Sequence, residues 1–158
     1  MAKKVLVVVD MQNDFITGSL GTPEAQAIVP KVVEKIQGFG GTVLYTQDTH
    51  GADYLQTQEG RNLPVEHCLK GTWGWQLEPR VEAVRASTPI EKPTFGSKGL
   101  AEVLKARHTC EGPLEEIQLI GLCTDICVIS NALLVKAFLP EAEIVVVGAP
   151  YWADQFPA

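Results

Sequence analysis

The sequence lacks the features that would indicate a membrane-spanning, secreted or nucleic-acid-binding protein. Its first apolar run, Val5 to Val9, is too short to cross a bilayer or to form the apolar centre of a signal peptide. No cluster of lysine and arginine is present, and the net charge of −6 argues against nucleic acid as a partner. The four cysteines contain no C-x-x-C pair, which disfavours a redox motif or a zinc ribbon. We therefore expect a cytoplasmic protein with reduced thiols and with no membrane partner.

Internal repeats, low-complexity segments and a phosphate-binding loop are also absent. The glycines of residues 94–99 do not have the G-x-x-x-x-G-K-[ST] spacing, so we do not expect a nucleotide. Apolar residues make up 46% of the chain and charged residues 20%, which are the proportions of an ordinary globular protein. A length of 158 residues fits one domain, residues 1–158, with a substantial core.

Apolar runs of strand length alternate along the chain with segments of helical spacing. This alternation predicts a three-layer α/β/α domain of the Rossmann-like kind, with a central, mostly parallel sheet. Residues 51–75 have little periodicity and are expected to form a long loop, which in a compact domain is usually functional. The expected strands lie near residues 5–9, 42–46, 89–91, 117–122 and 144–147, and the expected helices near residues 23–38, 77–84, 97–107 and 128–137.

One segment of the sequence places a cysteine between a buried strand and a helix. The apolar run from Ile117 to Leu122 has the length of a strand, and apolar residues recur at helical spacing from Val128 onward. Cys127 therefore falls at or near a helix N-terminus, where backbone N–H groups and the helix dipole favour a thiolate. The residue is thus a candidate nucleophile. The alternative is a buried cysteine that acts only as a small hydrophobic side chain.

Four polar residues come directly after predicted strands: Asp10, Asp48, Lys92 and Cys127. Ligands of parallel sheets bind beyond the carboxyl ends of the strands, so one edge of the sheet could collect all four. Asp10, Lys92 and Cys127 then form a plausible catalytic trio, in which the carboxylate takes the thiol proton and the ammonium favours the thiolate. Taken singly, an aspartate after a strand can be a turn residue, and a lysine before Pro93 can be a solvated one.

A second group of polar residues, which starts just before the expected long loop and continues into it, could hold a metal ion. Two of the three histidines of the chain fall here among carboxylates, and the group consists of Asp48, His50, Glu59 and His67. Imidazole and oxygen ligands suit a divalent ion. Zinc is favoured by the order of affinities, with iron or manganese as alternatives. The other interpretation is polar turn chemistry with no ion.

Four segments resemble the isochorismatase-like cysteine hydrolases and, within them, the nicotinamidases. They lie at residues 9–15, 48–50, 92–97 and 121–128, in the order found in that family, and the last is the most specific. The resemblance implies the family's fold and a triad of Asp10, Lys92 and Cys127. It also implies a cis peptide bond between Leu122 and Cys123. That bond would turn the N–H of Cys123 beside the N–H of Cys127, and the two would form an oxyanion hole.

The resemblance likewise implies a metal site and a substrate. Nicotinamidases hold a metal through an Asp-x-His pair and a later histidine, which match Asp48, His50 and His67, and some add a glutamate, which Glu59 could supply. The implied reaction is hydrolysis of nicotinamide to nicotinate and ammonia through a thioester on Cys127, with one divalent ion as cofactor.

One departure from the family concerns the substrate site. Family members often have an aromatic residue just before the metal-binding histidine, whereas residues 63–66 here are Leu-Pro-Val-Glu. We therefore expect Leu63 and Phe15 to line the substrate site. Other small amides or carbamoyl compounds are alternative substrates. A catalytically silent, metal-stabilised binding or scaffold protein is the alternative of a different class.

A second departure concerns the edge of the sheet. The family normally continues with a further helix after the strand near residues 144–147, and no such apolar helix follows here, so this edge looks truncated. An uncovered face or an unpaired edge strand is an association site, and Tyr151, Trp152 and Phe156 are aromatic enough to anchor a contact. We therefore expect a homo-oligomer with the C-terminal region in or beside a subunit interface.

Overall fold

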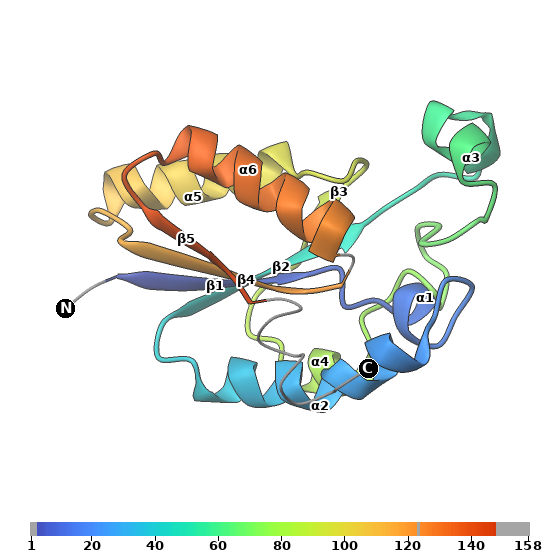
Figure 1. Cartoon of the computed structure of the whole chain (residues 1–158), viewed down its shortest axis with the longest axis horizontal. Helices are drawn as coiled ribbons and strands as arrows, with labels where there is room; N and C mark the ends of the chain where they lie inside the picture. The colour runs from blue at the N-terminus through green and yellow to red at the C-terminus, as the bar shows by residue number, and fades with distance from the viewer. Residues whose placement is uncertain (1–2, 123, 148–158) are drawn as a thin grey trace.

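A single parallel sheet runs through the protein, which is known from a computed structural model that describes residues 3–122 and 124–147. Within these ranges the sheet has five strands, all parallel, in the order β3-β2-β1-β4-β5 (Figure 1). The parallel sheet expected from the sequence is therefore confirmed. In chain order its strands are β1 (Lys4–Val9), β2 (Thr42–Asp48), β3 (Ile90–Lys92), β4 (Glu116–Gly121) and β5 (Glu143–Val146).

Helices cover both faces of this sheet and complete the three expected layers (Figure 1). On one face lie α2 (Pro23–Gly38) and α4 (Pro79–Ala83), and on the other lie α5 (Lys98–Cys110) and α6 (Ile129–Phe138). Each face has its own apolar core. None of the helices in the described ranges is long and apolar enough to cross a membrane.

The central strand β1 explains why its sequence is a continuous apolar run. Leu6 and Val8 belong to the core beneath α2 and α4, while Val5, Val7 and Val9 belong to the core beneath α5 and α6. All five side chains are almost fully buried. Burial of one such side chain contributes about 1.5–3 kcal/mol, so both faces of β1 stabilise the sheet.

Three short helices have no counterpart among the elements expected from the sequence. They are α1 (Asn13–Ile16), the 3₁₀ turn η1 (Tyr54–Gln56) and α3 (Gln58–Asn62). Helices of three to five residues are too short for helical periodicity to be visible in a sequence. Local hydrogen bonds hold them instead: the hydroxyl of Thr57 accepts one from the N–H of Gly60 at 3.0 Å. The expectation of a long loop over residues 51–75 was therefore wrong where η1 and α3 lie.

The end of β4 requires a glycine. Gly121 has a φ of 133°, and a Cβ atom at this residue would lie 2.1 Å from the carbonyl oxygen of Val9. No other residue tolerates both the conformation and the contact. β4 therefore ends in close contact with β1. Asp10 follows β1 and the turn that leads to Cys127 follows β4, so this contact sets the distance between Asp10 and that turn.

Three expectations concern residues outside the described ranges. Cys123 and its peptide bond to Leu122 fall there, and so do Tyr151, Trp152 and Phe156. The cis bond, the N–H of Cys123 in an oxyanion hole and the C-terminal subunit contact therefore stay predictions.

Candidate active site

The carboxyl ends of β1 and β3 bring Asp10 and Lys92 into a buried ion pair. The Lys92 Nζ atom lies 2.8 Å from Asp10 Oδ2, and neither side chain is exposed to solvent. The ammonium also donates a hydrogen bond to the Thr94 carbonyl oxygen at 3.0 Å and lies 3.6 Å from Asp48 Oδ1. On the other side, the Thr46 hydroxyl donates to Asp10 Oδ1 at 2.8 Å. Both charged groups are therefore held in place by several contacts from neighbouring strands.

Burial and charge act in opposite directions on this pair. Burial raises the pKa of the Asp10 carboxyl above its ordinary value, although the Lys92 charge opposes the shift. Burial by itself would lower the pKa of the Lys92 ammonium, but the negative charges of Asp10, Cys127 and Asp48 outweigh it, so that this pKa is raised. Lys92 therefore stays protonated at neutral pH. Asp10 has the raised pKa that suits a group which accepts and returns a proton.

Cys127 lies in a π-helical turn, η2 (Thr124–Val128), which leads directly into α6. The expected position near a helix N-terminus is confirmed, whereas the π-helical form of the turn was not visible in the sequence. π-Helical turns are rare and often occur at functional sites. Cys127 is 3% exposed, and its charge contributes to the raised pKa of Lys92. The candidate nucleophile and the Asp10–Lys92 pair are thus close enough to interact.

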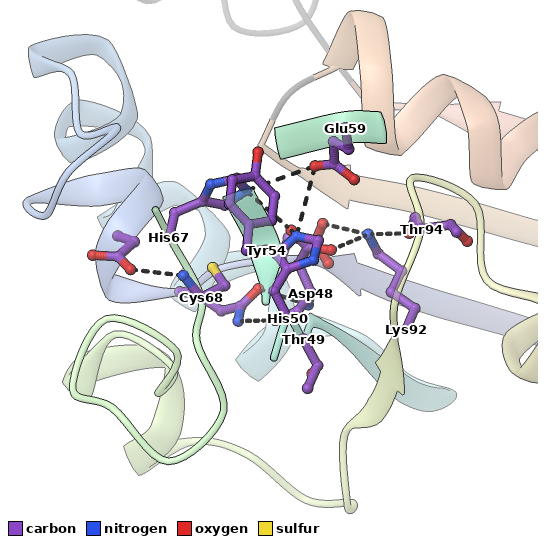
Figure 2. Close-up of polar contacts among 12 residues, drawn as sticks. Asp48, Thr49, His50, Tyr54, Glu59, His67, Cys68, Lys92 and Thr94 are labelled. Carbon is purple, nitrogen blue, oxygen red and sulfur yellow. Dashed lines mark hydrogen bonds and ion pairs between the residues drawn. The ribbon is translucent and has the colours of Figure 1, made fainter. Parts of the chain in front are cut away.

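The four candidate metal ligands converge beside this pair (Figure 2). One ligand atom from each of Asp48, His50, Glu59 and His67 lies within 4.8 Å of the other three. Asp48 Oδ2 lies 3.0 Å from His50 Nε2 and 3.5 Å from His67 Nε2, and Glu59 Oε1 lies 3.6 Å and 3.9 Å from the same two nitrogens. The structure thus brings together residues that are up to 19 positions apart in the chain, the separation of Asp48 and His67. A set of two imidazoles and two carboxylates fits a divalent transition metal.

Hydrogen bonds outside the cluster orient its members. The Gln12 side chain pairs with the backbone of Asp48, donating to its carbonyl oxygen and accepting from its N–H, both at 2.8 Å. His67 Nδ1 lies 2.8 Å from the Val65 carbonyl oxygen, which accepts a hydrogen bond when Nδ1 carries the proton. That tautomer leaves the lone pair of Nε2 directed at the cluster, as a metal ligand requires.

An isolated β-bridge and one aromatic ring bring the two histidines together. The bridge joins His50 to Leu69 and so places the segment of His67 beside the end of β2. The ring of Tyr54 contacts both imidazoles, with ring centroids 4.7 Å from His50 and 5.0 Å from His67 (Figure 2). Tyr54 is buried, and its hydroxyl donates to the Leu63 carbonyl oxygen at 2.9 Å. This tyrosine therefore links the histidines to the wall of the adjoining pocket.

A pocket of about 290 Å³ joins the metal cluster to the cysteine. Asp48, Glu59 and His67 line one part of it and Cys127 another. Apart from Thr22, the rest of the lining is apolar and includes the expected Phe15 and Leu63, together with Leu20, Ala25, Phe95, Leu122 and Ile126. No lysine or arginine lines the pocket in the described part of the chain. The cavity therefore suits a small, largely apolar molecule with one group for a metal and one for a thiol.

Sequence reasoning gave no individual role to several of these residues. Gln12 and Phe95 lie inside the recognised segments, so their contacts could have been sought there. Thr46 was seen only as a strand residue. Tyr54 carried one usable signal, since it is the aromatic residue of the segment between His50 and His67.

Comparison with known proteins now places the chain. A family model described as the isochorismatase domain matches residues 4–148. The chain belongs to the isochorismatase family. Among the family's curated members, the nicotinamidase of Saccharomyces cerevisiae is 25% identical, in an alignment that covers 82% of this chain and 80% of the yeast protein.

Solved structures of isochorismatase-family amidases share the fold. N-carbamoylsarcosine amidase from Thermoplasma acidophilum is 32% identical with a TM-score of 0.73, covering 98% of this chain and 90% of that one. Pyrazinamidase of Pyrococcus horikoshii, solved in complex with zinc, is 26% identical with a TM-score of 0.68, covering 90% and 87%. The expected fold and the expected class, a hydrolase of amide C–N bonds, are confirmed at this level.

Proposed function

We propose that this chain is a cysteine-dependent amidohydrolase that converts nicotinamide to nicotinate and ammonia. The supporting observation is the pocket, in which apolar walls separate a metal-ligand cluster from the Cys127 thiol. A flat pyridine carboxamide matches this arrangement, because its ring is apolar, its ring nitrogen is a metal ligand and its amide carbonyl is the group that a thiol attacks.

The first half of the proposed reaction forms a thioester. Asp10 takes the proton of the Cys127 thiol, and the resulting thiolate attacks the amide carbonyl carbon. The Lys92 ammonium, 2.8 Å from Asp10, keeps the carboxylate ionised until the proton arrives. Asp10 then returns this proton to the amide nitrogen as the C–N bond breaks. Ammonia leaves, and the acyl group remains on Cys127.

The second half hydrolyses the thioester. Asp10 takes a proton from water as the oxygen attacks the acyl carbon, and the Cys127 thiolate leaves and recovers that proton. In both halves an oxyanion forms on the carbonyl oxygen. The backbone N–H groups of Cys127 and Cys123 are the proposed donors to it, and loss of one such donor costs about 2.7–4 kcal/mol in the transition state.

The proposed metal ligands are Asp48, His50, Glu59 and His67. Their donor atoms suit zinc best, with iron or manganese as alternatives. A bound divalent ion would supply a Lewis acid for the ring nitrogen and so fix the orientation of the substrate. The apolar side chains of Phe15 and Leu63 would then hold the faces of the ring and limit the access of water.

A second candidate function is hydrolysis of a small carbamoyl compound by the same residues. It is favoured by the 32% identity to N-carbamoylsarcosine amidase over 98% of the chain. In addition, Leu63 stands where family members often have an aromatic residue, and an aliphatic side chain recognises a pyridine ring less specifically than an aromatic one does. Against it stands the metal-ligand cluster at the pocket, which a ring nitrogen would use.

Ammonia release from a panel of nicotinamide, pyrazinamide and N-carbamoylsarcosine tests the proposal. We expect the highest kcat/KM with nicotinamide. A preference for N-carbamoylsarcosine would favour the second candidate. The absence of ammonia from all three, by protein that contains one divalent ion per chain, would favour the silent binding or scaffold protein.

A further inference from the structure

Asn131 is a fully buried polar residue in the first turn of α6, four residues after Cys127. It has no place in the reaction described above. Ala132 and Val135, one and four positions further along the same helix, belong to the apolar core. A buried amide is retained only where its hydrogen-bonding groups are satisfied, so its partners indicate what it does.

The side chain of Asn131 joins two separate segments of the site. Its Nδ2 atom donates to the carbonyl oxygen of Cys127 at 2.8 Å and to that of Phe95 at 3.1 Å. Its Oδ1 atom accepts a hydrogen bond from the N–H of Ser97 at 2.8 Å. Both amide protons and one oxygen lone pair are thus used, and rotating the amide by 180° would set two donors against each other at Ser97.

The segment that Asn131 holds is also tied to the ion pair. Residues 94–97 begin two positions after Lys92, whose ammonium donates to the Thr94 carbonyl oxygen at 3.0 Å. At its other end the Ser97 hydroxyl caps α5 by accepting from the N–H of Leu100 at 3.0 Å. Asn131 therefore links this loop to the turn that carries Cys127.

Two of the three hydrogen-bond partners of Asn131, Phe95 and Cys127, line the same pocket. Phe95 is 43% exposed as a residue, so packing alone holds it weakly. We propose that Asn131 is a positioning residue, which sets the separation between the Phe95 wall of the pocket and the Cys127 thiol. This inference rests on the proposed role of Cys127 as the nucleophile, and it adds a residue that fixes the substrate relative to it.

Asn131→Asp is the sharpest variant for testing this inference. It preserves size and the acceptor for Ser97 but replaces the two-proton donor with an oxygen that repels the carbonyls of Cys127 and Phe95. Because a displacement of about 1 Å can cost about 100-fold in rate, we expect kcat/KM for nicotinamide to fall by about 10- to 100-fold. Asn62→Asp makes the same chemical change at an exposed residue and should leave kcat/KM unchanged. Metal content and the far-UV circular dichroism should match the wild type in both variants.

A double-mutant cycle with Phe95→Ala separates positioning from a general structural role. Phe95→Ala alone should raise KM, and in the Asn131→Asp background the same change should alter KM by no more than about twofold, because the wall is already displaced. Wild-type kinetics in Asn131→Asp would overturn the inference. So would a double variant whose change in KM equals the product of the changes in the two single variants. If Asn131→Asp does not fold, Asn131→Ser, which is too short to reach Phe95, takes its place with the same expectations.

Alkylation of Cys127 by iodoacetamide, followed on its peptide by mass spectrometry, needs no substrate. We expect Cys127 to react about tenfold more slowly at pH 7 in Asn131→Ser than in the matched surface variant Asn62→Ser, because the thiol is no longer held near Lys92. Equal rates would overturn the inference. If the wild type releases no ammonia from nicotinamide, the proposed function fails, while this measurement still decides the role of Asn131.

Discussion

Replacing Lys92 with methionine should destabilise the protein strongly at neutral pH and weakly at acidic pH. The substitution preserves most of the apolar length of the side chain but removes the ammonium, which lies 2.8 Å from Asp10 Oδ2 in a fully buried pair. Within the described part of the chain, the Asp10 carboxylate then keeps one hydrogen bond, which the Thr46 hydroxyl donates at 2.8 Å. Loss of one partner of a buried pair costs about 3–5 kcal/mol, because the other charge is left uncompensated.

The dependence on pH follows from the pKa of Asp10. Burial already raises this pKa in the wild type, and without the Lys92 charge it rises further in the folded state. Below the pKa of about 3.9 that an unfolded aspartate has, the carboxyl is neutral in both states and the penalty vanishes. As the pH rises toward the folded-state pKa, the free energy of unfolding falls by about 1.4 kcal/mol per pH unit.

Urea unfolding of Lys92→Met at pH 4 and pH 8 measures this penalty. The double variant Asp10→Asn/Lys92→Met is the matched control, since it lacks the buried charge and shares any effect of the lysine on Asp48. The two variants should have similar free energies of unfolding at pH 4, and the single variant should be less stable by about 3–5 kcal/mol at pH 8. A difference that does not change with pH would refute the claim that Lys92 stabilises an ionised Asp10.

Three further predictions concern the nucleophile, the metal and the assembly. Cys127→Ala should abolish hydrolysis of nicotinamide while fold and metal content stay intact, whereas Cys123→Ala and the exposed Cys110→Ala should have mild effects. If an ammonia assay shows that Cys123→Ala is inactive and Cys127→Ala is active, the nucleophile is misassigned. His67→Ala should lose the divalent ion, one per chain in the wild type by elemental analysis, whereas His108→Ala should retain it. Light scattering at micromolar concentration should detect a homo-oligomer, and a clean monomer would contradict the expected C-terminal interface.

Long elements and strand ends could be predicted from the sequence because their signals are local. The expected helix at residues 23–38 coincides with α2, since a proline at its first position and a helical apolar pattern mark it. Asp10, Asp48 and Lys92 were recognised because each one closes or follows a strand, and parallel strands all end at the same edge of the sheet.

Contacts between distant segments could not be read in the same way. Tyr54 reaches the Leu63 carbonyl oxygen only because η1 and α3 fold the segment between them, and helices this short leave no periodic pattern. Asn131 did carry a signal, because it stands among the apolar residues of α6 where a core side chain is expected. Two of its partners are distant in the chain: Phe95 is 36 residues away and Ser97 is 34 residues away.

Trapping the acyl group with hydroxylamine tests the central claim, a thioester on Cys127, most directly. Hydroxylamine attacks thioesters, so the wild-type protein incubated with nicotinamide and hydroxylamine should form nicotinohydroxamate at the expense of nicotinate. Ammonia release should continue, since it precedes the trapping step. The Cys127→Ala variant should form neither product. Nicotinate formed by the wild type without any hydroxamate, or hydroxamate formed by Cys127→Ala, would contradict the account.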